Sequence, residues 1–181
     1  DLAADERLQF AKGELPPPFD AAAQPQPPPQ QWDQVRLAKA NRNYALDYIR
    51  NGLCELAEVI GAHEAASLGA LAARLIGLQY FAETAAMLGC RDGDLQDAGE
   101  YLRRMFGGMG DTVQTNVAAG QVDLMHHGLR VVRGLQGTER ELVLTCWAEL
   151  WAGTMAAQQQ LKTLAWQAAP DGMRWTLRAR Q

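Results

Sequence analysis

Residues that usually carry metal or redox chemistry are scarce in this sequence. It has three cysteines and three histidines in 181 residues, and no CxxC, HxH, HxxxH or Glu-x-x-His spacing. Metal sites built from these side chains need such close spacings, so we expect no metal ion, and we also expect no cofactor. Three widely spaced cysteines are typical of reduced thiols rather than of a disulfide framework, which favours a cytoplasmic location.

Positive charge and targeting signals are also sparse. The chain has 17 lysines and arginines against 21 acidic residues, a net charge of −4, whereas nucleic-acid binding needs a concentrated basic face. The opening "DLAADERLQF" has no basic region followed by an apolar one, so we expect no signal peptide. The most apolar run, residues 65–90, is interrupted by Arg74 and Glu83 and does not predict a membrane span. We therefore expect neither a nucleic acid nor a membrane as partner.

Proline is nearly absent outside one short segment. Residues 14–31, "ELPPPFDAAAQPQPPPQQ", hold seven of the eight prolines. Each proline fixes φ and removes an amide donor, so we expect an N-terminal segment, 1–31, with an extended arm of polyproline II character, and a single domain at 32–181. A passive linker is the favoured interpretation. The alternative is an arm that lies across the domain or a partner subunit, anchored by Phe19.

From Trp32 onward, apolar residues recur at helical spacing. At about 100° per residue one face carries Val35, Ala38, Leu46, Ile49, Leu53, Leu56 and Ile60. Tyr44 and Tyr48 align one turn apart and away from this stripe, which indicates a second buried contact. Arg42 falls within the stripe, where a cation must reach solvent, pair with a carboxylate or bind an anionic ligand.

A second helix is predicted from about His63 to Leu88, and it is apolar almost all round. Such a helix is central in its domain or shared with another subunit. It predicts a homodimer or association with another chain, although the N-terminal arm could cover the same surface instead. A third helix is predicted to start at Asp94 and to end at the "GGMG" of residues 107–110.

After residue 110 the apolar period changes from 3.6 residues to 2. Strands are predicted at "TVQTNVA", "QVDLMHHGLRVVR" and "ERELVLTCW", followed by a helix from Ala148 to about Gln167, a "PDG" turn and a last strand, "MRWTLRAR". Short connections favour antiparallel pairing. We therefore expect an α+β fold, with N-terminal helices packed on a C-terminal antiparallel sheet of three to four strands with one further helix.

Two adjacent histidines lie in the second predicted strand. Neighbouring strand residues face opposite sides, so His126 and His127 cannot both point into one site without a distortion. The apolar positions change from even to odd numbers near Gly128, which predicts a β-bulge there and places His126 on the core side. His126 is then either a proton-transfer partner or an ordinary core histidine.

Cys146 is the candidate nucleophile. It is predicted to lie where a strand turns into a helix, and there the helix dipole and free amides would lower the pKa of its thiol and hold an oxyanion. Glu149 could carry a proton or cap that helix. A turn at 135–138 would bring Cys146 close to His126. The alternative is a small buried apolar side chain, the commonest role of an unpaired cysteine.

The segment "LVLTCWAELWAG", the helix after it and the last strand "GMRWTLRAR" resemble the C-terminal pattern of L-2-amino-thiazoline-4-carboxylic acid hydrolase-like proteins, and related small-molecule-binding domains of the vinyl-reductase type. The similarity covers roughly residues 68–181. It implies a domain that encloses a small organic ligand, with Cys146 as nucleophile or anchor in hydrolysis of a C–N bond. The chain departs from the pattern in its last strand, where Trp175 stands in place of a further cysteine.

Two functions remain open at this point. The first is a small-molecule-binding domain that acts as a cysteine-dependent hydrolase or lyase on a compact amide-like or heterocyclic substrate. Its candidate catalytic residues are Cys146, His126 and Glu149, and its candidate substrate-binding residues are Arg42, Trp147, Tyr44 and Tyr48. The second is a non-catalytic ligand-sensing or protein-interaction module, in which the same residues line or fill a pocket.

Overall fold

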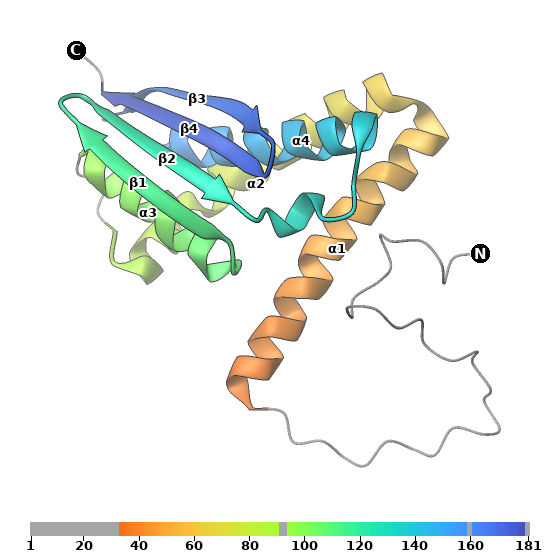
Figure 1. The fold of residues 1–181 in the computed structure, drawn as a ribbon, viewed down its shortest axis with the longest axis horizontal. Helices are drawn as coiled ribbons and strands as arrows, with labels where there is room; N and C mark the ends of the chain where they lie inside the picture. Colours follow the sequence, from red (N-terminus) through yellow and green to blue (C-terminus); the bar gives the residue numbers. More distant parts are fainter. Residues whose placement is uncertain (1–32, 91–93, 159–160, 180–181) are drawn as a thin grey trace.

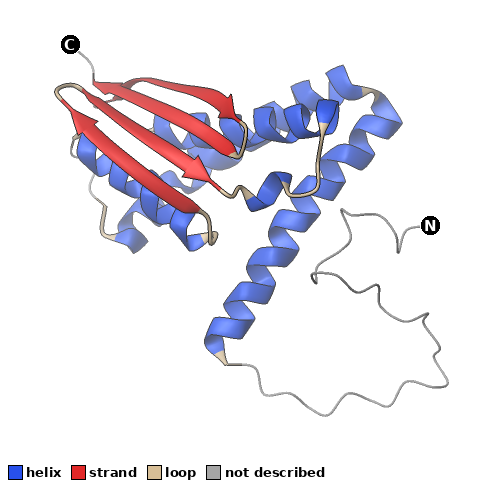
Figure 2. Ribbon diagram, viewed as in Figure 1, coloured by secondary structure: helices blue, strands red, loops and turns tan. Residues whose placement is uncertain are grey.

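The computed structural model describes residues 33–90, 94–158 and 161–179, so the Pro-rich segment and Phe19 lie outside the described residues. The helices are α1 (Gln34–Ile60), α2 (Ala62–Leu88), α3 (Leu95–Gly108) and α4 (Gly137–Ala156), with a short 3₁₀ helix, η3, at Arg130–Val132. The strands are β1 (Thr112–Ala118), β2 (Gln121–His127), β3 (Leu161–Ala169) and β4 (Gly172–Ala179). N-terminal helices, a C-terminal sheet and one further helix confirm the α+β class (Figure 1, Figure 2).

The ends of the first three helices follow local signals in the sequence. The side chain of Asp33 accepts a hydrogen bond from the N–H of Arg36 at the start of α1, and that of Asp94 accepts one from the N–H of Gln96 at the start of α3. Gly89 ends α2 with φ at 66°, a left-handed conformation that glycine adopts without a steric penalty. These three elements are where the sequence predicts them.

The sheet is antiparallel and four-stranded, in the order β1-β2-β4-β3. Along β2, buried side chains alternate with half-buried ones, which places Val122, Leu124 and His126 on the inner face. On β4, Trp175 lies opposite Leu124 and Met173 lies opposite His126. Helices α3 and α4 contact the strands on this face, while the other face is open (Figure 1).

Helix α4 is buried on nearly all sides because it lies between the sheet and the outer helices α1 and α2. Its backbone touches that of α2. A Cβ atom on Gly77 would overlap the carbonyl oxygen of Leu150, and one on Gly153 would overlap the carbonyl oxygen of Arg74. The two glycines therefore permit the close crossing that holds the outer helices on the domain.

Three predictions for the C-terminal half are wrong: a strand, the end of a helix and a β-bulge. The segment "ERELVLTCW" is part of helix α4, because an apolar run that is covered from two sides shows no clear helical period. Residues 161–169 form the edge strand β3 rather than the end of a helix. No β-bulge forms at Gly128, since β2 ends at His127 and the chain turns into η3. The first and last predicted strands, β1 and β4, are confirmed.

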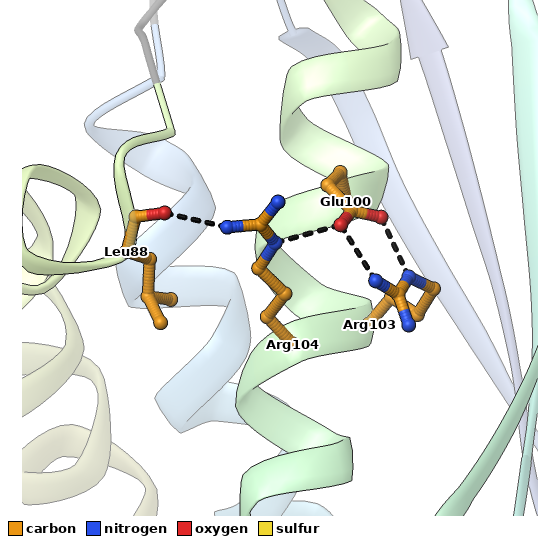
Figure 3. A network of polar contacts seen from close by, with 4 residues as sticks. All are labelled: Leu88, Glu100, Arg103 and Arg104. Carbon is orange, nitrogen blue, oxygen red and sulfur yellow. Dashed lines mark hydrogen bonds and ion pairs between the residues drawn. The ribbon is translucent and has the colours of Figure 1, made fainter.

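An arginine on α3 ties this helix to the end of α2 (Figure 3). Arg104 donates to the carbonyl oxygen of Leu88, the last residue of α2, at 2.6 Å and to Glu100 at 2.7 Å. Glu100 also accepts two hydrogen bonds from Arg103. A cation at a helix C-terminus satisfies a carbonyl that has no partner within the helix and interacts favourably with the helix dipole.

Candidate functional site

An apolar groove with a volume of about 320 Å³ lies between α1, α2 and α4. It is lined by Tyr48, Ile49, Gly52, Leu53, Leu56, Gly69, Ala72, Ala73, Ile76, Val143, Cys146, Trp147 and Leu150. Almost all of these side chains are apolar or absent. The two glycines and two alanines have little or no side chain, which leaves the space of the groove open. We call this hollow the helical groove.

Cys146 lies beneath the helical groove, in the middle of α4 and not at its N-terminus. Its side chain is buried with Ala65 and Leu142, and a Cβ atom on Gly69 would come within 2.7 Å of its sulfur. Burial raises the pKa of the Cys146 thiol to about 11. The expected activation by a helix N-terminus is therefore wrong, and the thiol is protonated at neutral pH.

His126 is fully buried on the opposite side of α4, against α3 and the sheet. Its Nε2 lies 2.9 Å from Oδ2 of Asp111, and its ring stacks on Phe106 with centroids 4.0 Å apart. The backbone N–H of Arg130 donates to the other oxygen of Asp111. The predicted turn at 135–138 leads into helix α4 and not into a strand, so it does not bring Cys146 to His126.

The other candidate residues are dispersed. Glu149 pairs with Arg74 on α2 at 2.8 Å. Arg42 donates to the carbonyl oxygen of Gly108 at the end of α3. Tyr44 is 69% exposed, so the second buried contact expected of it does not exist within the described residues. Arg42, Tyr44 and Glu149 thus lie outside the helical groove.

Three of the candidate residues do come together. Cys146 and Trp147 lie side by side in the wall of the helical groove, and Tyr48 lies at its edge with 81% of its surface exposed. Trp147 is 4% exposed, and its indole Nε1 has no hydrogen-bond partner among the described residues. An aromatic wall with an unused donor beneath it suits a ligand that is mostly apolar.

Two polar features were not predicted from the sequence. Arg50 on α1 is buried, donates to the carbonyl oxygen of Arg133 at 2.9 Å and pairs with Asp47 at 2.8 Å. Arg50 follows Leu46 by four residues and precedes Cys54 by four. This helical spacing from two buried residues could have predicted that Arg50 is buried. The hydrogen bond to Arg133 fixes α1 to the loop that leads into α4, and the pair with Asp47, within α1, holds the guanidinium in place.

The second feature is a shallow polar hollow of about 690 Å³ on the open face of the sheet. Its centre holds Asp123, which accepts hydrogen bonds from Thr176 and Gln121. These contacts lower the pKa of the Asp123 carboxyl below its usual range. The donors and acceptors at the centre satisfy one another, as is common on the solvated face of an antiparallel sheet.

Comparison of this chain with known proteins finds no similar protein. No family model, no curated protein and no solved structure matches this chain. Among the described residues, no group of three or more His, Cys, Asp or Glu side chains could hold a metal ion. The class of protein is therefore defined by the fold and the groove alone: an α+β domain with an apolar hollow among its helices.

Proposed function

We propose that this chain is a small-molecule-binding module that holds a compact, largely apolar ligand in the helical groove and performs no chemistry on it. The observation that carries the proposal is the groove itself. Its volume of about 320 Å³ lies at the lower end of the range for ligand sites, and its lining is apolar and aromatic. A heterocycle or other single-ring compound matches that size and that lining.

The contacts of Cys146 and His126 favour binding over catalysis. A thiol nucleophile needs a base within hydrogen-bond reach, whereas Cys146 packs in an apolar cluster with Ala65 and Leu142, and the charge of Glu149 adds to the rise in its pKa. Its raised pKa leaves little thiolate at neutral pH. His126 is engaged by Asp111 and stacks on Phe106, which belongs to a different cluster of buried residues. In this proposal Cys146 shapes the groove as a small apolar side chain.

The resemblance of the C-terminal half to small-molecule-binding domains agrees with this proposal in the kind of function but not in the position of the site. The resemblance implies a ligand between helices and a short sheet, whereas the helical groove lies among three helices. The three free cysteines also support a reducing, cytoplasmic compartment as part of the proposal.

Filling the groove tests the proposal. A Cβ atom on Gly52 meets no atom within 4 Å, so Gly52→Leu places a side chain in the groove without a backbone clash. We expect this variant to bind the neutral fluorescent probe N-phenyl-1-naphthylamine at least about tenfold more weakly than the unaltered chain, because the added atoms exclude the ligand. The affinity is measured by fluorescence titration of the full chain.

The matched control is Gly107→Leu, which adds the same side chain to a glycine of α3 that is equally open and lies outside the groove. It should bind the probe as the unaltered chain does. Native mass spectrometry of the purified protein provides an independent measurement, since a ligand retained during purification should be lost in Gly52→Leu alone. Equal probe affinity in both variants would remove the helical groove as the site.

A further inference from the structure

Helix α2 carries a second apolar surface, which faces away from the helical groove and from α4. Leu68, Leu71 and Leu75 are 56%, 57% and 56% exposed, and Leu78 is 42% exposed. At about 100° per residue these four leucines lie within an arc of about 80°, while Gly77, which touches α4, lies about 140° from the centre of that arc. We call the four leucines and Ala82 the leucine seam.

The spacing of the leucine seam is that of a coiled coil. Successive members are three, four, three and four residues apart, which is the a/d pattern that inserts side chains into the gaps of a facing helix. No described element covers this pattern. From this spacing we infer that the leucine seam is the contact surface of a homodimer, in which α2 of one copy packs against α2 of a second copy.

The area of the leucine seam suits this partner. The four leucines leave on the order of 400 Å² of apolar surface facing water, within the size range of apolar patches that mark interaction sites. Two seams face to face, with their flanking side chains, bury roughly 1,000 Å², which is the lower bound of a specific interface. A seam that contacts its own copy gives a closed two-fold assembly.

The borders of the leucine seam favour a protein partner over a lipid one. By length and composition α2 could cross a membrane, and 22% of its most apolar window is buried. However, Ser67 and Arg74 border the seam on one side, and Gln79 and Glu83 border it on the other. Arg74 is already paired with Glu149. An apolar stripe with polar edges is the anatomy of a protein interface.

The test is the oligomeric state of the full chain, measured by sedimentation velocity from low to high micromolar concentrations. The unaltered chain is expected to sediment as a dimer. Leu71→Glu combined with Leu75→Glu should weaken dimerisation by at least about tenfold. Each copy contributes two glutamates, so four like charges would be buried in an interface that excludes water. Both positions are exposed in the single chain, so the fold itself should persist, as checked by circular dichroism.

The matched control combines Val59→Glu with Met87→Glu, which adds the same charge at apolar side chains that are 80% and 74% exposed and lie outside the seam. This variant should remain a dimer, as should Gly52→Leu, so the result is independent of the groove. A full chain that is monomeric at every concentration would overturn the inference, and so would equal dimerisation of both double variants. Flotation of the monomeric chain with phosphatidylcholine vesicles, lost only in the seam variant, would assign α2 to a membrane instead.

Discussion

At the scale of single residues, the surroundings of Cys146 determine its chemistry. Its sulfur is enclosed by apolar side chains and by the backbone at Gly69, so a thiolate there would lose its hydration without gaining a counter-ion. The pKa of about 11 follows from that loss of hydration. Its neighbour Trp147 packs instead in the main core, with its ring against Trp151, and also lines the helical groove.

Alkylation of Cys146 should therefore be slow in the folded protein. Raising its pKa from 9.0 to about 11 lowers the fraction of thiolate about 100-fold at pH 8. We expect iodoacetamide to label it at least that much more slowly than in the chain unfolded by urea, with a rate that rises about tenfold per pH unit. Peptide mass spectrometry measures the rate. His126→Ala should leave it unchanged, and rapid labelling at neutral pH would restore the nucleophile hypothesis.

At the scale of elements, the junction of α2 and α3 depends on charge. Hydrogen bonds from Arg103 and Arg104 lower the pKa of Glu100 from 4.5 to about 2. The unfolded chain takes up this proton near pH 4.5, before the folded chain does. The stabilisation by Glu100 is therefore present above about pH 4.5 and is lost as the pH falls towards 2.

Glu100→Gln should measure this contribution. We expect it to lower the free energy of unfolding by about 0.5–1 kcal/mol at pH 7, a value reduced for solvent screening because about a third of the Glu100 side chain is exposed. The difference from the unaltered chain should shrink to nothing near pH 2 in urea titrations. Glu58→Gln, which removes a carboxylate elsewhere on a helix surface, serves as the control. A pH-independent difference would mean that the ion pairs do not stabilise the junction.

At the scale of the whole molecule, stability depends on the glycine contacts between α2 and α4. Gly153→Ala adds one methyl group where the carbonyl oxygen of Arg74 already lies, so the helices must separate. We expect it to lower the free energy of unfolding by roughly 2 kcal/mol or more in urea titrations. Gly107→Ala, in open space, should raise it by up to about 1 kcal/mol. Similar effects of Gly153→Ala and Gly107→Ala on the free energy of unfolding would contradict the close crossing of α2 and α4.

The positions of α1, α2, α3, β1 and β4 were predictable from the sequence because their signals are local. Asp33 and Asp94 cap helices with their own side chains, Gly61 and Gly89 end them, and β4 shows the alternation of a sheet with one solvated face. The α+β class follows from these elements alone. The sequence predicted Cys146 as a nucleophile and Trp147 as a substrate-binding residue; the structure places both in the lining of the helical groove, and their roles there stay predictions.

Only the tertiary structure decided α4, β3 and the composition of the candidate site. The segment at 139–147 is covered by α2 on one side and by the sheet on the other, so its apolar residues show no face and its helix could not be distinguished from a strand. β3 is rich in residues that favour helices, and its hydrogen bonds to β4 override that preference. Because α4 is a helix, Cys146 and His126 lie on its two opposite sides. Whether two residues meet depends on which layers pack together, and the spacing of residues along a chain does not contain that information.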